Sequence, residues 1–355
     1  MNYQDYFGPY AEEQNKFLKK FFKQKKVEGR RSTPVVAPKM WEEFETFIDG
    51  GKRMRGGLVR LGYESFGGKK LKSVIPVSAA MEINHCALLI EDDVIDRDVL
   101  RHGVPTIHAK YKAYHKKNYR KDEPQHYGNS MAICVGLMGI YEALGLVAGS
   151  DFIPDRKAQA AEFMCRFLVN TIYGEALDVD LSYHTNLIEK DVLSVYQLKT
   201  AWYTIVGPLG VGASLTGVSP HKLKVLEKYG LPLGIAFQLQ DDILGIFGNE
   251  KKTGKSVASD IKEGKNTLLY VYALKKGTPK QIQELKKLWG KKEISAAEIK
   301  EVRQIIVDSG SLEYCQKRAQ KLGEEAKLAI AKITRDKKLQ GVYSTLVDFV
   351  VQRES

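Results

Sequence analysis

The sequence predicts an all-α protein, a single large helical bundle, and three observations support this fold class. Apolar residues recur at three- and four-residue spacings along most of the 355 residues, which is the periodicity of helices that bury one face. Runs that alternate apolar and polar residues, as half-buried strands do, are scarce. Helix starts are also visible. Ser295 and Glu298 form a capping-box pattern. Thr278, Pro279 and Gln281 suit the cap, first and third positions of another helix.

The chain length and a hydrophobic content of 43% allow either one large domain or two ordinary ones. No Pro- or Ser-rich linker and no fixed-period repeat marks a boundary, so we expect one domain over residues 1–355. Residues 1–39 are expected to form an N-terminal amphipathic helix followed by the connector RRSTPVVAPK. The next helix is expected to begin near Met40.

Two stretches, 131–149 and 200–218, approach the ~20 apolar residues that cross a bilayer. The first is interrupted by Glu142, and the second contains Pro208 and several glycines and has Lys199 at its edge. We therefore predict buried core helices at both positions. The N-terminus, MNYQDYFGPYAEEQNK, lacks the basic start and continuous apolar stretch of a secretory signal, which favours a cytoplasmic protein.

The four cysteines, Cys86, Cys134, Cys165 and Cys315, are widely separated along the chain. They form no CxxC pair, so the sequence indicates neither a zinc site nor a disulfide framework. We expect them to be reduced thiols in the core.

The formal net charge of +12 favours anionic partners, which include nucleic acid, acidic lipid and phosphorylated small molecules. Residues 110–129 concentrate this charge, because Lys, Arg, His and Tyr crowd between two apolar segments. Basic residues interleaved with aromatic ones fit nucleic acid, but a solvated loop is the favoured interpretation, and a lid over an anionic substrate is a third. We expect no specific nucleic-acid partner.

A first acidic motif lies in EINHCALLIEDDVIDRD, which is predicted to be helical. A rotation of about 100° per residue places Asp92 and Asp96 only ~40° apart, so their carboxylates share a face. Two like charges on one face are unfavourable unless a cation lies between them, and oxygen ligands suit magnesium better than zinc. Asp93 lies beside them. A solvated acidic patch is the alternative.

A second motif, AFQLQDDILGIFG, repeats this design with Asp241 and Asp242 after Gln238. Both acidic pairs are embedded among Leu, Ile and Val, whereas solvated charges normally lie on a polar face. Carboxylates in such surroundings are expected to line an internal cavity. Two such motifs in one helical chain weaken the surface-patch interpretation.

Magnesium held by one or two carboxylates usually completes its octahedron with water and substrate phosphate. Two acidic helices therefore indicate a diphosphate bound through several metal ions, with cationic side chains nearby. Cations lie beside glycines, a threonine or the acidic motifs in several segments. They are Lys52, Arg53, Arg55, Arg101, Lys199, Lys255 and Lys265.

The chain resembles the trans-isoprenyl diphosphate synthases, which include farnesyl, geranylgeranyl and longer polyprenyl diphosphate synthases. The resemblance covers nearly the whole chain. Six motifs match in order: GGKRMR, NHCALLIEDDVIDRDVLRHGVPTIH, GEALD, LKT, FQLQDDILGIFG, and TGK with DIKEGK. It implies a helical bundle of the isoprenoid synthase type with a central active-site cavity. It also implies a prenyltransferase that condenses isopentenyl diphosphate with an allylic diphosphate to a geranylgeranyl or longer product.

The resemblance also implies roles for individual residues. Asp92, Asp96 and Asp241 would ligate about three magnesium ions, with Asp93 and Asp242 in support. Lys199, Thr200, Gln238, Lys255 and Arg101 would hold the allylic diphosphate, and Lys265 is a further cation near it. Lys52, Arg55 and His85 would hold isopentenyl diphosphate. A homodimer and peripheral membrane association through the product are expected by the same analogy.

His85 also has a geometric argument of its own. It lies two helical turns before Asp92 and only ~20° away around the helix, so it can face the same cavity. A hydrogen-bonded core histidine is the alternative interpretation.

The sequence departs from the family pattern at four places. His102 follows Arg101 where a second arginine is usual, which weakens one expected contact to isopentenyl diphosphate. The second motif ends at Gly245 instead of an aspartate, Glu175 stands where glutamine is common, and Leu137 where aspartate is frequent. We expect these departures to affect rate and not reaction type.

Product length is expected to depend on the residues below the first motif. In the family, bulky aromatic residues four or five positions before the first aspartate stop chain growth, and Leu88 and Ala87 hold those positions here. Neither is aromatic, so we predict products of at least twenty carbons.

Two rival functions are a class I terpene cyclase and a non-catalytic partner subunit of a prenyl synthase. GGKRMR and DDILG argue against a cyclase, which needs no second diphosphate site and carries a mixed Asn/Ser/Glu second motif. The intact acidic motifs argue against a non-catalytic subunit, whereas His102 and Leu137 favour it.

Overall fold

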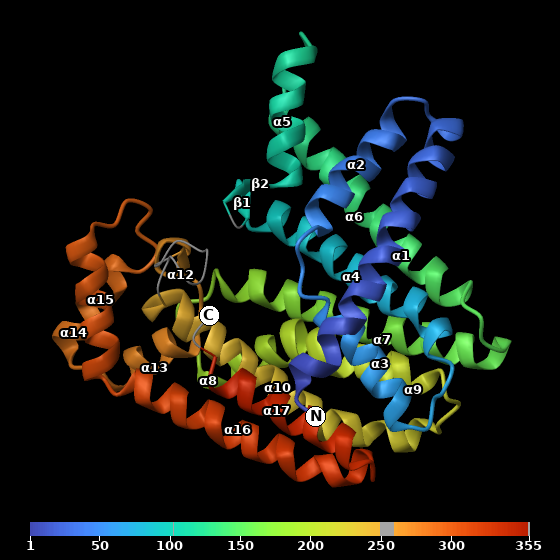
Figure 1. The fold of residues 1–355 in the computed structure, drawn as a ribbon. Helices are drawn as coiled ribbons and strands as arrows, with labels where there is room; N and C mark the ends of the chain where they lie inside the picture. Colours follow the sequence, from blue (N-terminus) through green and yellow to red (C-terminus); the bar gives the residue numbers. More distant parts are fainter. Residues whose placement is uncertain (102, 249–258, 354–355) are drawn as a thin grey trace. The chain divides into compact units, whose positions relative to one another are not determined.

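The computed structural model describes residues 1–101, 103–248 and 259–353, and these are predominantly helical (Figure 1). The predicted all-α fold class is confirmed. The strands of the described part are β1 (Leu100–Arg101) and β2 (Val104–Pro105), which pair antiparallel. The chain divides into two compact units. We call residues 4–164 with 208–219 the N-terminal unit, and residues 1–3, 165–207 and 220–355 the C-terminal unit. The single domain stays a prediction.

The N-terminal unit contains β1 and β2 and most of the helices before residue 164. Its helices are α1 (Tyr3–Ser32), α2 (Val36–Ile48), α3 (Met54–Ser65), α4 (Leu71–Ile95), α5 (Ile107–Asn118), α6 (Pro124–Ala148), the start of α7 (Pro154–Leu181) and α9 (Gly207–Ser214). α4 and α6 pack against each other (Figure 1). α1 and α2 pack on each other through buried aromatic rings: the centre of the Phe22 ring lies 6.0 Å from those of both Trp41 and Phe44.

Glycines allow α3 and α9 to cross at contact distance. A methyl group on Gly62 would overlap the Leu209 carbonyl oxygen, and one on Gly212 would overlap the Val59 carbonyl oxygen. Each glycine therefore faces the backbone of the other helix, where no side chain fits. This crossing fixes α3, which begins within the GGKRMR motif at Met54.

The C-terminal unit is built around α10 (Pro220–Phe247), which packs on α16 and on the segment η1. Its further elements are the end of α7, α8 (Glu189–Val195), η1 (Tyr196–Val206), α12 (Ser259–Glu263), α13 (Leu268–Lys276), α14 (Pro279–Leu288), α15 (Ala296–Asp308), α16 (Ser311–Ile333) and α17 (Lys337–Val351). The capping boxes at Thr278 and Ser295 are confirmed. Tyr229 on α10 stacks edge-on against Tyr343 on α17 and donates to its carbonyl oxygen at 3.0 Å.

The prediction of a loop over residues 110–129 is wrong. α5 covers its first part and α6 begins at Pro124, so only residues 119–123 lie outside helices. Tyr111, His115 and Tyr119 recur every four residues and place their rings 5.1–6.3 Å from Tyr127 on α6. This helical period is masked in the sequence by the lysines between the rings. The connector before α2 is also shorter than predicted, because α1 continues to Ser32 and α2 begins at Val36.

The apolar stretches differ in burial. Residues 200–218 are largely buried in η1 and α9, as predicted, whereas α6 exposes Ile133, Leu137 and Tyr141. α4 and α6 are each long and apolar enough to cross a membrane by length and composition alone, a test that core helices also pass. In α4, 67% of the apolar window is buried, against 33% in α6.

The prediction of four core cysteines is wrong for two of them. Cys86 and Cys315 are buried, but Cys134 and Cys165 are exposed on α6 and α7. Both exposed cysteines lie on helices whose apolar residues do not all face inward, so apolar surroundings in the sequence did not mean burial.

Candidate active site

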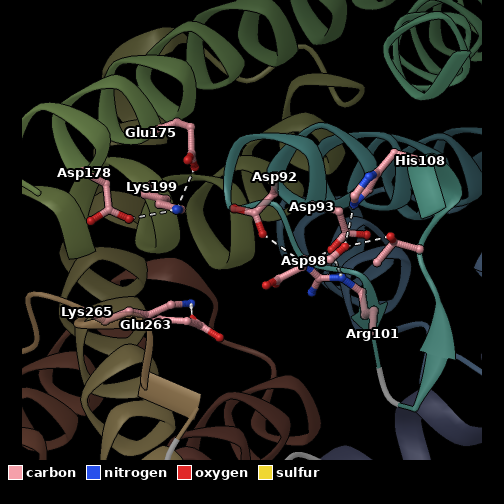
Figure 2. Close-up of polar contacts among 11 residues, drawn as sticks. Asp92, Asp93, Asp98, Arg101, His108, Glu175, Asp178, Lys199, Glu263 and Lys265 are labelled. Carbon is pink, nitrogen blue, oxygen red and sulfur yellow. Dashed lines mark hydrogen bonds and ion pairs between the residues drawn. The ribbon is translucent and has the colours of Figure 1, made fainter. Parts of the chain in front are cut away.

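The first acidic motif ends α4, where Asp92 and Asp93 both pair with Arg101 of β1 (Figure 2). Arg101 Nε donates to Asp93 Oδ1 at 2.7 Å, and Nη2 donates to Asp92 Oδ2 at 3.0 Å. The hairpin is tied to the end of α4, because Thr106 Oγ1 and His108 Nε2 both donate to the Asp98 carbonyl oxygen, at 2.7 and 2.6 Å. Arg101 is thereby held as a fixed cation at the motif.

The three aspartates of this motif have different environments. The Asp93 side chain is 1% exposed, and burial raises its pKa to about 6, although Arg101 shifts the pKa in the opposite direction. Asp92 is 21% exposed, and Asp96 is exposed at the end of α4. The motif therefore presents Asp92 and Asp96 towards solvent and keeps Asp93 inside, paired with Arg101.

The GGKRMR turn is held by a buried arginine that is not one of the predicted substrate contacts. Arg53 has a left-handed backbone with φ of 53° and is 6% exposed. Its Nε donates to Asn15 Oδ1 and its Nη1 to the Ile48 carbonyl oxygen, both at 2.7 Å. Lys52 is exposed in this turn, and Arg55 is half-buried in the first turn of α3, directly after the residue that fixes the turn.

His85 lies on α4 in an electropositive environment. Burial lowers its pKa well below the ordinary value, and the charges of Arg55, Arg101 and Arg53 lower it further. His85 is therefore neutral at physiological pH and offers one donor and one acceptor. The predicted substrate contacts His85, Arg55 and Arg101 thus lie close enough to influence one another electrostatically.

The second acidic motif forms a chain of hydrogen bonds inside the C-terminal unit. Thr200 Oγ1 donates to Gln238 Oε1, and Gln238 Nε2 donates to Asp242 Oδ1, both at 2.8 Å. Tyr196 donates its hydroxyl proton to Asp242 Oδ2 and accepts from the Leu268 amide at 2.9 Å. Burial, together with the nearby Asp260, raises the pKa of Asp242 to about 8. The structure therefore brings three of the predicted residues together: Thr200, Gln238 and Asp242.

Lys199 and Thr200 lie in the π-helical segment η1, a widened helix type that occurs often at functional sites. Lys199 Nζ lies 2.8 Å from Glu175 Oε2 and 2.9 Å from Asp178 Oδ2 on α7 (Figure 2). Gly174 makes this approach possible, because a methyl group there would overlap the Lys199 amide. Glu175, which departs from the family pattern, is thus an ion-pair partner of a predicted substrate lysine.

The glycine that ends the second motif, Gly245, lies against the side chain of Asp260. A methyl group on Gly245 would overlap the Asp260 carboxylate, so the glycine leaves room for a carboxylate that comes from α12. Asp260 was not predicted as a site residue. The DIKEGK match contains it, and that match was the available signal.

Asp241 is paired as well, since Arg353 Nη1 lies 2.7 Å from Asp241 Oδ1. Lys265 pairs with Glu263 at 3.1 Å (Figure 2). The predicted contacts His102 and Lys255 lie outside the described residues.

The donor set fits magnesium, since it consists of aspartate carboxylates on α10 and at the end of α4. Each acidic motif also carries a guanidinium, Arg101 on one and Arg353 on the other, which marks both as cation-binding positions. In residues 1–101, 103–248 and 259–353, no three His, Cys, Asp or Glu side chains are arranged to hold a metal alone. Magnesium needs only one or two carboxylates when substrate phosphate and water complete its shell.

Comparisons with known proteins match the chain to one family over most of its length. A family model described as polyprenyl synthetase matches residues 38–306. The geranylfarnesyl diphosphate synthase of Aeropyrum pernix is 32% identical over 86% of this chain and 91% of its own. The geranylgeranyl diphosphate synthase of Methanosarcina mazei is 28% identical over 90% and 92%. A crystal structure of geranylgeranyl pyrophosphate synthase from Corynebacterium glutamicum, complexed with isoprenyl diphosphate and magnesium, superposes with a TM-score of 0.90 at 30% identity. It covers 98% of this chain and 99% of its own.

The helical fold and the two aspartate-bearing helices are those of a prenyltransferase of isoprenoid metabolism. The chain belongs to the polyprenyl synthetase family, as the order of its motifs predicted.

Proposed function

We propose that the protein is a magnesium-dependent synthase that condenses isopentenyl diphosphate with an allylic diphosphate to a geranylgeranyl or longer trans-polyprenyl diphosphate. The observation that carries the proposal is the likeness over 98% of the chain to a synthase crystallised with isoprenyl diphosphate and magnesium. Relatives named geranylgeranyl and geranylfarnesyl diphosphate synthases support the product class.

In the proposed reaction the allylic carbon–oxygen bond breaks and pyrophosphate leaves. The double bond of isopentenyl diphosphate attacks the allylic carbocation, and loss of a proton to the departing pyrophosphate completes a five-carbon extension. Magnesium, when bound, would neutralise charge on the leaving diphosphate. Asp92, Asp96 and Asp241 would hold about three such ions, and Asp93 and Asp242 would support them.

The chain's cations then position the two substrates. Lys199 and Arg101 hold the allylic diphosphate, together with Thr200, Gln238 and Lys255. Lys52, from the turn that Arg53 fixes, and Arg55, from the start of α3, hold isopentenyl diphosphate, and the neutral His85 donates one hydrogen bond to it. Oriented charges of this kind stabilise an ionising substrate without reorganisation during the reaction.

The test of this function is product analysis. Isopentenyl diphosphate, each allylic primer and Mg²⁺ are incubated with the protein, with and without EDTA, and products are identified by mass spectrometry. We expect diphosphates of at least twenty carbons, formed only with Mg²⁺. A cyclic hydrocarbon formed without isopentenyl diphosphate would instead identify a terpene cyclase.

Asp92→Ala and Asp241→Ala are the matched variants for this assay. Each removes one metal ligand but little buried apolar area, so we expect a loss of turnover of at least about a thousandfold with unchanged circular dichroism. Near-normal turnover in both variants would contradict the assigned roles.

We also propose that the protein is a cytoplasmic homodimer that associates with membranes only through its product. Ile133, Leu137 and Tyr141 recur every four residues on α6 and are 42%, 45% and 69% exposed. A continuous apolar stripe of this kind is typical of a surface that is covered in an assembly. Leu137, where relatives often have an aspartate, belongs to this stripe and increases its apolar area.

A further inference from the structure

Arg353, near the end of the chain, is placed on the aspartate that we assign to the second metal site. Its Nη1 lies 2.7 Å from Asp241 Oδ1, although the two residues are 112 positions apart. Nothing in the motif pattern of the sequence pointed to this residue. The contact lies entirely within the C-terminal unit.

Two further contacts hold the segment from the end of α17 to Arg353 at this position. Gln240 Nε2 donates to the Val351 carbonyl oxygen at 2.7 Å, which fixes the last turn of α17 against α10. The Arg353 guanidinium carbon lies 5.0 Å from the centre of the Phe237 ring, within cation–π range. Phe237, Gln240 and Asp241 belong to one segment of α10, so residues 351–353 are docked on the acidic motif itself.

We propose that Arg353 competes with the divalent cation for Asp241. A guanidinium at 2.7 Å and a magnesium ion are both cations, so their simultaneous contact with one carboxylate oxygen is opposed by charge repulsion. The metal therefore binds Asp241 by displacing the C-terminal arginine. This proposal rests on the proposed function only for the identity of Asp241 as a metal ligand.

The exposure of the pair makes displacement feasible. Arg353 and Asp241 are 21% and 28% exposed, and an ion pair in such a setting contributes a factor of at most about five to an equilibrium constant. Arg101 differs, because it bridges two carboxylates and one of them is buried. Arg353 is therefore the exchangeable cation, and Arg101 remains part of the first site.

The test measures metal binding without turnover. Mn²⁺ is titrated into metal-free protein in the absence of substrate, and free Mn²⁺ is followed by electron paramagnetic resonance. Arg353→Gln should bind Mn²⁺ about fivefold more tightly than the wild type. Arg335→Gln, which removes an exposed arginine of the same unit, is the control for the loss of one charge and should stay within about twofold.

Two further variants separate competition from a structural role. Arg353→Lys keeps the charge and should stay close to the wild type, and in an Asp241→Asn background Arg353→Gln should no longer change the affinity. The proposal is overturned if Arg353→Gln matches Arg335→Gln, if its effect persists without Asp241, if Arg353→Lys behaves like Arg353→Gln, or if neither wild type nor Arg353→Gln binds Mn²⁺. If prenyl products are absent but the expected Mn²⁺ shifts occur, only the proposed function fails.

Discussion

Asp242 shows how one residue couples the site to folding. Its folded pKa of about 8 lies far above the ordinary value of 3.8, mainly because of burial. The folded protein therefore keeps a proton on Asp242 that the unfolded chain releases above pH 4. The contribution of this group to the free energy of unfolding is therefore fully present below about pH 4 and is lost as the pH rises towards 8.

We expect Asp242→Asn to reduce the pH dependence of stability in the metal-free protein. Between pH 5 and 7.5 the wild type should lose up to about 1.4 kcal/mol of unfolding free energy per pH unit through this group, and the variant should not. Urea unfolding at several pH values measures the difference. Parallel curves for the two proteins would show that Asp242 ionises normally in the folded state.

At the scale of the element, α3 depends on a buried carboxylate from α4. The Gly56 amide, at the start of α3, donates to Glu82 Oε1 at 2.7 Å, and Glu82 is 4% exposed. α3 begins directly after Lys52 and the left-handed Arg53. Glu82 therefore positions the start of α3, which carries Arg55 and follows the turn that carries Lys52.

Glu82→Ala should raise KM for isopentenyl diphosphate by about tenfold, since a hydrogen bond to a charged group is worth about 1.5–3 kcal/mol. KM for the allylic primer should change less than about twofold, because the described residues assigned to that substrate do not contact Glu82 and distant sites respond independently. Glu82→Gln keeps one acceptor oxygen and should restore most of the affinity. Equal changes in both constants would indicate a general loss of structure.

The two residues predicted to set product length both lie on α4, but in different environments. Ala87 is fully buried, and a methyl group on Gly139 of α6 would lie 2.9 Å from its Cβ and 2.5 Å from Phe44 Cε2. Leu88 is partly exposed and lies one turn before Asp92. The packed side of α4 therefore carries Ala87, and the accessible side carries Leu88.

Leu88→Phe should shorten the product, because its ring extends into accessible space beside the growing chain. Ala87→Phe should instead lower stability by about 1–3 kcal/mol, because its ring meets Gly139 and Phe44. Mass spectrometry of products and thermal unfolding of both variants measure these effects. An unchanged product distribution in Leu88→Phe would remove this residue from chain-length control.

Local sequence signals were sufficient for the all-α class, the capping boxes at Thr278 and Ser295, and the helices that carry the two acidic motifs. Pairings between distant residues were not predictable, because they depend on packing that brings together residues such as Arg353 and Asp241. Gly245 is an example. In the sequence it looks like the loss of an aspartate from the second motif, whereas in the structure the space beside it is filled by the Asp260 carboxylate. Tyr111, His115 and Tyr119 are a second example. Their four-residue spacing is that of one helical face, but the lysines between them made the segment look like a loop.

At the scale of the whole molecule, the exposed stripe on α6 predicts self-association. Leu137→Glu together with Tyr141→Glu should convert a dimer to a monomer in sedimentation-velocity experiments, because each change places a charge in an apolar contact. The control is Glu162→Gln, which changes an exposed side chain on α7 and leaves the stripe intact. A wild-type monomer, or a dimer that survives both charges, would contradict the proposed interface.

The docking of Arg353 on Asp241 has a practical consequence for handling the protein. A purification tag fused after Ser355 would be separated by only two residues from Arg353, which contacts the second acidic motif. A polyhistidine tag there would bring metal-chelating imidazoles to a carboxylate whose metal affinity is to be measured. A tag at the N-terminus would also lie close to α17, since the Tyr3 amide donates to Thr345 Oγ1 of that helix at 2.9 Å. Metal titrations therefore call for protein from which any affinity tag has been cleaved.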